Sequence, residues 1–333
     1  MRMAWASKVG VVIALFAGLV AAVWIIWAVG FGDVWAAIAQ AGFTGLVLLC
    51  LYAAVMLLIA AFGWACILPR EQRPPLHDFY IARLVRDSIG DLSPFSPLGG
   101  MVAGARLMIV KGMNGVYASA AVAIDYTTEA IAQVVFLGLG LAIAVATLSV
   151  QSEMGPLLQT LMATLLLAVP AIFAMILLQK RGAGFFERIT ARFFPQMKDG
   201  VSFGQAIHDL YESPARLAAS TFWHLIGWLM SGGACWLSFR LVGVEVSLLD
   251  AMAIEALLCT LRSMAVFVPA AVGVQEGGYA ALAAMFGLPP ESGVAVSLLK
   301  RAREIVLGVP ALIYWQSMEA AALRAARAVG GAP

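Results

Sequence analysis

Ionisable residues stand near the middle of two apolar segments of this sequence. The segment 116–148 contains Asp125 and Glu129, which lie four residues apart and therefore share one face of a helix. Asp125 stands about ten residues into the segment, so it lies roughly 15 Å deep in a hydrocarbon core about 30 Å thick. A carboxylate at that depth could contact the polar head group of a lipid or act as a general base.

The segment 293–315 carries mainly basic residues. Lys300, Arg303 and Glu304 share a helical face, whereas Arg301 points well away from them. Each unpaired charge at the bilayer midplane costs roughly 2.5 to 3.5 kcal/mol on insertion scales, so we expect the charges of both segments to face inward and largely pair. The pairs could serve only to fix helix packing. Apolar packing would do this without the desolvation cost, so we favour a polar pathway or a head-group site. Three charged residues between these two segments would extend the lining of such a pathway or site: Glu255, Arg262 and Glu276.

The stretch 91–106 lies between apolar segments but cannot continue as a regular helix, because two prolines and three glycines stand close together. These residues are Pro94, Pro97, Gly99, Gly100 and Gly104. A similar break within 251–287 is marked by Pro269, Gly273 and Gly277. Broken backbone at membrane depth survives only where it is buried in protein or lines a wet cavity. We therefore predict two re-entrant stretches, with full crossings as the alternative. The G-x-x-x-G pairs 100/104 and 273/277 predict close helix packing.

The composition indicates an all-α polytopic membrane protein that forms a single integral domain, 1–333. Hydrophobic residues make up 62% of the chain, charged residues make up 12%, and the mean hydropathy is +0.92. This is too little polar material to cover a soluble globule. The cysteines lack C-x-x-C spacing, and His77, His208 and His224 lack metal-ligand spacing, so no metal, cofactor or nucleic acid is expected. Six full crossings are predicted, at 9–30, 43–68, 116–148, 157–178, 218–241 and 293–315.

The distribution of Lys and Arg predicts the orientation of these crossings. With six crossings, the basic residues of 2–8, 70–111, 180–216 and 324–327 fall on one side, which should be cytoplasmic. Both termini are then cytoplasmic. Within 180–216, the side chains of Phe185, Ile189 and Phe193 would share a helical face, which favours an interfacial helix, although a simple linker explains the segment equally well.

An internal repeat emerges when the sequence is shifted by 175 positions. This shift brings Pro94 onto Pro269, Gly112 onto Gly287 and Glu129 onto Glu304. The first half covers 43–148 and the second covers 218–316, and each contains a crossing, a broken stretch and a charged crossing. The predicted topology makes the halves inverted relative to each other, an arrangement that recurs in transporters.

The motifs SPFSPLGG and DYTTE, followed later by VPAAVGVQEGGY and LLKRARE, resemble those of a known family. The chain is similar, over about 10–320, to the lysylphosphatidylglycerol synthase transmembrane (flippase-like) superfamily, and most similar to its hopanoid-biosynthesis-associated membrane proteins. The resemblance implies a bacterial inner-membrane protein related to the lipid-translocating half of these synthases. No aminoacyl-transferase domain accompanies it here, so no synthase activity is expected. On the family pattern, the functional positions are Pro97, Gly99, Gly100, Pro269, Gly273, Glu276, and either Arg301 or Arg303.

Together these features predict a non-enzymatic transporter that moves a hopanoid or a phospholipid through a polar cavity between the two halves. No G-x-x-x-x-G-K-S/T motif is present, so the energy should come from an ion gradient, the lipid gradient or a partner protein. Two alternatives stay open. The protein could be a lipid-modifying enzyme with Asp125 or Glu129 as general base, or a scaffold that recruits hopanoid-biosynthesis or transport proteins through 180–216. The sequence does not decide whether the protein forms a homo-oligomer.

Overall fold

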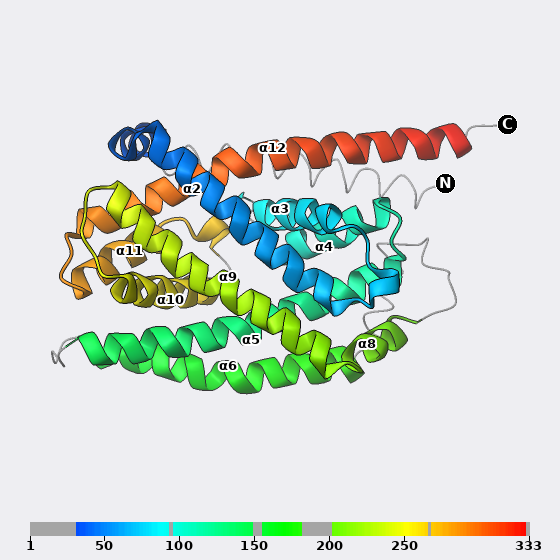
Figure 1. Ribbon diagram of the computed structural model, residues 1–333, viewed down its shortest axis with the longest axis horizontal. Coiled ribbons are helices and arrows are strands. Elements are labelled where there is room, and N and C mark those ends of the chain that lie inside the picture. Colours follow the sequence, from blue (N-terminus) through cyan, green and yellow to red (C-terminus); the bar gives the residue numbers. More distant parts are fainter. Residues whose placement is uncertain (1–30, 93–95, 149–154, 182–201, 266–267, 331–333) are drawn as a thin grey trace.

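The computed structural model describes residues 31–92, 96–148, 155–181, 202–265 and 268–330, and every regular element in these ranges is helical (Figure 1). The elements follow the order α2 (Phe31–Ile67), η1 (Arg70–Gln72), α3 (Leu76–Leu92), α4 (Ser96–Val110), α5 (Gly115–Thr147), α6 (Gly155–Arg181), α8 (Phe203–Tyr211), α9 (Pro214–Leu241), α10 (Leu248–Met264), η2 (Pro269–Ala271), α11 (Val274–Met285) and α12 (Pro290–Gly330).

Three of the described helices are long and apolar enough to cross a bilayer. They are the α2 segment Ala39–Ile67, the whole of α5, and the α12 segment Pro290–Ala322. These match the crossings predicted at 43–68, 116–148 and 293–315. The segments 157–178 and 218–241 lie in α6 and α9, and their crossing of the membrane stays a prediction. The first predicted crossing, 9–30, lies outside the described residues.

Each broken stretch separates the two arms of a helical hairpin. Helices α3 and α4 form the first hairpin, and α10 and α11 form the second, with η2 at its tip. The hairpins enter the bundle from opposite ends, and their tips meet near its middle (Figure 1). At this meeting point Arg262 of α10 donates a hydrogen bond from Nη2 to Asp91 Oδ1 of α3 at 3.1 Å. Pro94 lies outside the described residues, and Pro97 lies in the first turn of α4.

The glycines of the hairpins serve different purposes. A Cβ on Gly100 would lie 2.6 Å from the Arg86 carbonyl oxygen, and one on Gly104 would lie 3.3 Å from Trp64, so both permit close packing of α4. Gly273 has a φ of 80° and stands at the N-terminus of α11, a conformation that glycine adopts without strain. The packing prediction for the pair 273/277 is wrong, because a Cβ at either position would meet nothing within 4 Å. The neighbouring Gly278 makes the close approach instead, at 2.6 Å from Leu258.

Helix boundaries in the two halves correspond at the same shift of 175. Helix α4 ends at Val110 and α11 at Met285, while α5 begins at Gly115 and α12 at Pro290. The connecting turns contain Gly112 (φ 95°) and Gly287 (φ 73°), both in the left-handed region. In Figure 1, α5 and α12 run in opposite directions along the bundle, as do α2 and α9. These correspondences support an inverted repeat, which stays a prediction.

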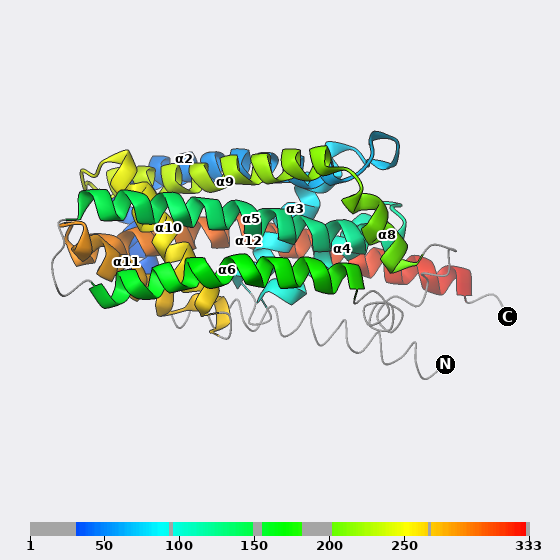
Figure 2. The same ribbon diagram turned by 90° about the horizontal axis from the view of Figure 1, so that it is seen from below.

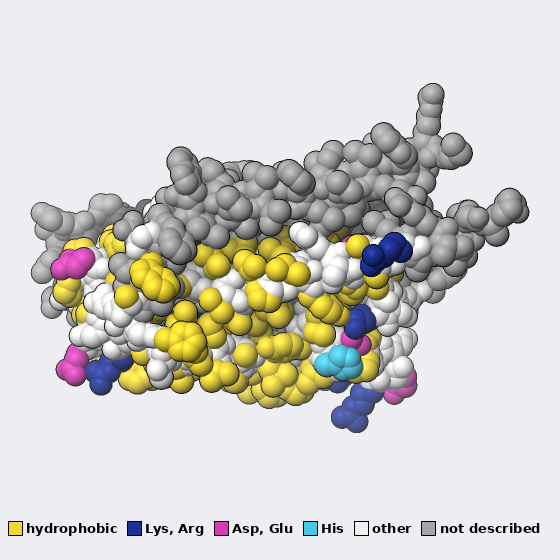
Figure 3. Space-filling model, turned by 90° about the horizontal axis from the view of Figure 1, so that it is seen from above, with side chains coloured by type: hydrophobic (Ala, Val, Ile, Leu, Met, Phe, Trp, Pro, Cys, Tyr) yellow, Lys and Arg dark blue, Asp and Glu magenta, His cyan; other side chains and the backbone are white. Residues whose placement is uncertain are grey.

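Apolar packing and surface chemistry agree with a membrane setting. One buried cluster surrounds Trp64, Phe79 and Leu107, and a second surrounds Phe239 and Leu257. On the face shown in Figure 3, charged side chains gather at the two ends and hydrophobic ones fill the middle. Most of the predicted interfacial segment 180–216 lies outside the described residues, but α8 packs against α5 near the C-terminal end of α6 (Figure 2).

Candidate functional site

A cavity of about 590 Å³ lies where the hairpin tips meet, between α2, α3, α5, α9, α10 and α12. Acidic and basic side chains line it in equal number. The basic ones are Arg83, Arg86, Arg262, Lys300 and Arg303, and the acidic ones are Asp87, Asp91, Glu129, Glu255 and Glu304. The charged part of the lining is therefore close to electrically neutral, and His224 is an additional titratable group. Apolar side chains such as Met56 and Leu57 complete the wall.

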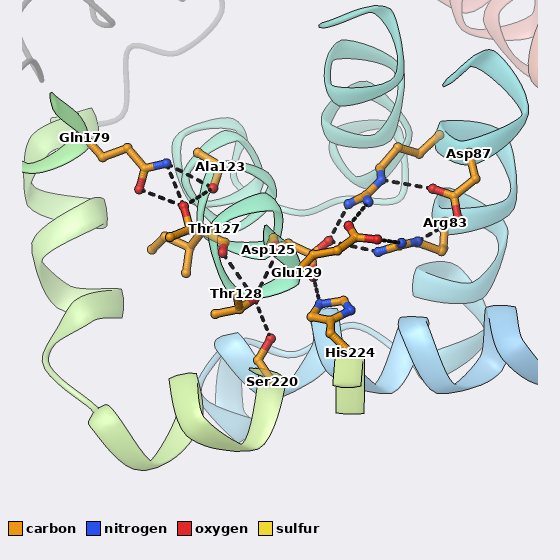
Figure 4. A network of polar contacts seen from close by, with 12 residues as sticks. Arg83, Asp87, Ala123, Asp125, Thr127, Thr128, Glu129, Gln179, Ser220 and His224 are labelled. Carbon is orange, nitrogen blue, oxygen red and sulfur yellow. Dashed lines mark hydrogen bonds and ion pairs between the residues drawn. The ribbon is translucent and has the colours of Figure 1, made fainter. Parts of the chain in front are cut away.

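The densest ionic contacts join α3 to α5, and we call these residues the α3–α5 cluster: Arg83, Arg86, Asp87, Asp125 and Glu129 (Figure 4). Each arginine contacts all three carboxylates. Arg83 lies 2.8 Å from Asp87 through Nε and 3.2 Å from Asp125 through Nη1, and both arginines also bind Glu129. Planar guanidinium groups suit this arrangement because they donate several hydrogen bonds in fixed directions.

Helices α9 and α6 attach to α5 through neighbouring polar contacts. His224 of α9 lies 2.8 Å through Nε2 from Asp125 Oδ1, the carboxylate oxygen that the arginines leave free (Figure 4). One turn away, Ser220 and Thr128 share a hydrogen bond of 2.9 Å between their hydroxyl groups. Gln179 of α6 donates to Thr127 of α5 at 2.9 Å. These bonds satisfy polar groups that would otherwise be costly to bury.

A second buried cluster ties α12 to the other hairpin. Lys300 donates to Glu255 of α10 at 2.6 Å and to the hydroxyl oxygen of Tyr279 of α11 at 2.6 Å. The Tyr279 hydroxyl in turn donates to the second oxygen of Glu255, and Ser231 of α9 donates to the first at 2.7 Å. Lys300 and Glu255 are 5% and 4% exposed, so this pair is almost completely removed from solvent.

Arg301 and Glu276 stabilise the bend between α10 and α11, and their side chains do not line the cavity. Arg301 donates from Nη2 to the Ala270 carbonyl oxygen at 2.7 Å and from Nε to Glu276 at 3.2 Å. Glu276 accepts the Gly273 backbone N–H at 2.7 Å through its other oxygen. Ala270 has a φ of 50°, which L-residues rarely adopt, so these contacts hold a strained turn in place.

The remaining charges at the cavity are held more loosely. Asp91 and Arg262 form the 3.1 Å pair between the hairpin tips, with side chains 34% and 28% exposed. Within the described part of the chain, the only ion pair of Arg303 is a 3.5 Å contact with Glu304. These partners can be exchanged for a ligand at lower cost than those of the two buried clusters.

The structure brings most of the predicted site residues to one place. Glu129, Arg262, Lys300, Arg303 and Glu304 line the cavity, and Asp125 lies directly behind its wall. The sequence predicts that the charges of 116–148 and 293–315 face inward and largely pair. In the structure each set pairs mainly with the hairpin of its own half.

Sequence reasoning missed three important groups, Arg83, Arg86 and His224. The distribution of basic residues predicts that the two arginines belong to a cytoplasmic segment, but they are 5% and 3% exposed and therefore do not contribute as loop charges. Their spacing, with Asp87, along one face of an otherwise amphipathic helix was the available signal. His224 lacks metal-ligand spacing, and nothing else in the sequence marks it as a site residue.

The sequence matches the family described as "Lysylphosphatidylglycerol synthase TM region" over residues 9–311. The chain belongs to this family. No curated protein and no solved structure matched the chain. Family membership and the long apolar helices together establish a multi-pass membrane protein of a lipid-related, flippase-like family.

Proposed function

We propose that this member of the lysylphosphatidylglycerol synthase TM family moves an amphipathic lipid, a hopanoid or a phospholipid, between the two leaflets of a membrane. The observation that carries the proposal is the ion-lined cavity of about 590 Å³ where the tips of two opposed hairpins meet. Its volume falls within the usual range of about 300 to 1,000 Å³ for ligand pockets. It suits a head group, whereas the acyl or hopanoid body would remain in the surrounding lipid.

The loosely paired residues supply the binding chemistry. Arg303 and Arg262 can donate to a phosphate or hydroxyl oxygen, and Asp91 can accept from an amino or hydroxyl group. The α3–α5 cluster and the Lys300–Glu255 pair keep their partners and hold the walls. A head group entering between Asp91 and Arg262 replaces one set of ionic contacts with another, which lowers the cost of taking it into the membrane interior.

Opposed hairpins provide a route to alternating access. In this proposal each hairpin is re-entrant and closes the cavity from one side of a bacterial inner membrane, and both chain termini are cytoplasmic. Rocking of one inverted half against the other would open the two sides in turn. The resemblance to hopanoid-associated members favours a hopanoid, and the ionic lining favours a phosphate-bearing lipid.

We also propose that the lipid leaves chemically unchanged. The carboxylates nearest the cavity are paired with arginine or lysine, an arrangement that favours permanent charge over proton transfer from a substrate. Mass spectrometry of lipids incubated with the purified protein should show no new species. A modified lipid would favour the intramembrane enzyme instead.

A proteoliposome assay tests the function. Fluorescent phospholipid and hopanoid analogues are offered in parallel to wild type, to Asp125→Asn and to Arg303→Gln. We expect wild type to move one lipid class, with Arg303→Gln slower by tenfold or more and still folded. Asp125→Asn should abolish lipid movement. Its folding must be measured as well, because this change leaves two arginines with one fewer charged partner.

Arg106→Gln is the matched control, because Arg106 pairs with Glu319 at 2.8 Å outside the cavity lining. It removes the same charge from an ion pair that touches no lipid in this proposal. Movement that Arg303→Gln and Arg106→Gln impair equally would argue against the assigned site. Absence of movement by folded wild type, with either lipid, would overturn the function.

A further inference from the structure

The α3–α5 cluster lacks one positive charge. Its two guanidinium groups face three carboxylates, so its net charge is −1. The other ion pairs around the cavity balance without a histidine: Arg262, Lys300, Arg301 and Arg303 stand against Asp91, Glu255, Glu276 and Glu304. The charge deficit is therefore local to the contact between α3 and α5.

His224 is placed to supply the missing charge. Its Nε2 lies 2.8 Å from Asp125 Oδ1, and the two side chains are 2% and 0% exposed. Because an ionised carboxylate only accepts hydrogen bonds, Nε2 carries the hydrogen and Nδ1 holds the lone pair that can take up a proton. His224 also belongs to the lining of the cavity, which gives that proton a route.

Among the described residues, the charged groups around the ring are carboxylates and the two arginines that contact them. Asp125 and Glu129 of α5 act on it electrostatically, and the arginines and Asp87 of α3 contact those same carboxylates. Helix α2 approaches with Gly63, where an added Cβ would lie 3.0 Å from the ring. Histidine is the side chain whose charge ordinarily changes between pH 5 and 8. Protonation here would convert a cluster of net charge −1 into a neutral one.

We propose that His224 is a proton-binding site and that its protonation is coupled to occupancy of the cavity by a phosphate-bearing head group. An anionic head group adds negative charge beside a cluster that already carries an excess of it. Proton uptake at Nδ1 offsets that charge, so lipid binding favours protonation and protonation favours lipid binding to the same extent. Release of the lipid then releases the proton. The coupling rests on the proposed function, but the proton site does not.

Lipid movement under a pH gradient tests the coupling. Full-length protein in liposomes is given a fluorescent short-chain phosphatidylglycerol, and the ratio of this lipid between the leaflets is measured at several imposed gradients. With one proton moved per lipid, one pH unit shifts this ratio about tenfold. His224→Gln should move the lipid to the same ratio at every gradient. His77→Gln and His208→Gln, whose side chains are 69% and 68% exposed, should behave as wild type.

A wild-type protein that moves this lipid to a ratio independent of the gradient would overturn the coupling and leave lipid transport standing. The proton site has its own test, which uses no lipid. In nitrogen-15 NMR of the histidine-labelled full-length protein in detergent, a signal lost in His224→Gln should change from the neutral to the protonated form as the buffer is acidified. A His224 ring that stays in one form throughout the acid titration of the folded protein would refute the proton site, even if no lipid moves and the proposed function has failed.

Discussion

Replacing Lys300 by Met should strongly destabilise the protein, because it leaves the Glu255 carboxylate buried without its cation. The Lys300 Nζ and Glu255 Oε1 atoms lie 2.6 Å apart, and both side chains are about 5% exposed. At an effective dielectric constant of about 20, their attraction is about 6 kcal/mol before desolvation is counted. Loss of one member of such a pair typically costs about 3 to 5 kcal/mol in unfolding free energy.

Proton uptake by Glu255 limits this cost. Protonating an ordinary glutamate at pH 7 costs about 3.5 kcal/mol, and the cost falls by about 1.4 kcal/mol for each pH unit below that. The folded variant would then bind one more proton than the unfolded one, so its stability should rise as the pH falls from 7 to 5. Wild type, with the pair intact, should lack this dependence at Glu255.

Reversible unfolding in mixed detergent micelles measures these free energies for wild type, Lys300→Met, Glu255→Gln and the double variant. The double variant should lose at least about 2 kcal/mol less than the sum of the single losses, because neither group is left unpaired. Losses that add to within about 0.5 kcal/mol, or a Lys300→Met penalty that stays constant from pH 7 to 5, would refute the assigned pair.

Three further predictions concern the hairpins. Gly100→Ala should cost about 1 to 3 kcal/mol, because its Cβ would lie 2.6 Å from the Arg86 carbonyl oxygen, while Gly138→Ala, with nothing within 4 Å, should be neutral or slightly stabilising by thermal unfolding. Gly287→Ala should cost about 1 to 2 kcal/mol through its φ of 73°, although space is free around it; a neutral result would contradict the left-handed turn. Arg262→Gln should slow lipid movement but lower the free energy of unfolding by only about 1 kcal/mol or less, because the Asp91 pair is partly exposed. A loss of stability large enough to explain the slower transport would argue for a purely structural contact.

The sequence was sufficient for features that depend on local periodicity and on residues that break helices. Asp125 and Glu129 share a face because they are four residues apart, and Pro269 lies in η2, between α10 and α11. The partners of these charges could not be read in the same way. Arg83 and Arg86 lie in a mixed segment after a proline-rich turn, and only the packing of α3 on α5 shows that they are buried.

His224 illustrates the same limit more sharply. A single histidine in the apolar segment 218–241 has no periodic partner, so its sequence context points to nothing. Its significance comes from a residue 99 positions away, Asp125, and from a glycine on α2 that leaves room for the ring. Tertiary contacts between distant helices decide such a site, and a single sequence does not specify them.

Pairing within each half also bears on how the chain enters the membrane during synthesis. In the first half the arginines of α3 are made before the carboxylates of α5, and in the second half Glu255 is made before Lys300. Each charged crossing therefore reaches the insertion machinery when its counter-ion is already present in the hairpin that precedes it. Integration of α5 and α12 should accordingly depend on those hairpins, so that neither crossing inserts efficiently when it is expressed alone.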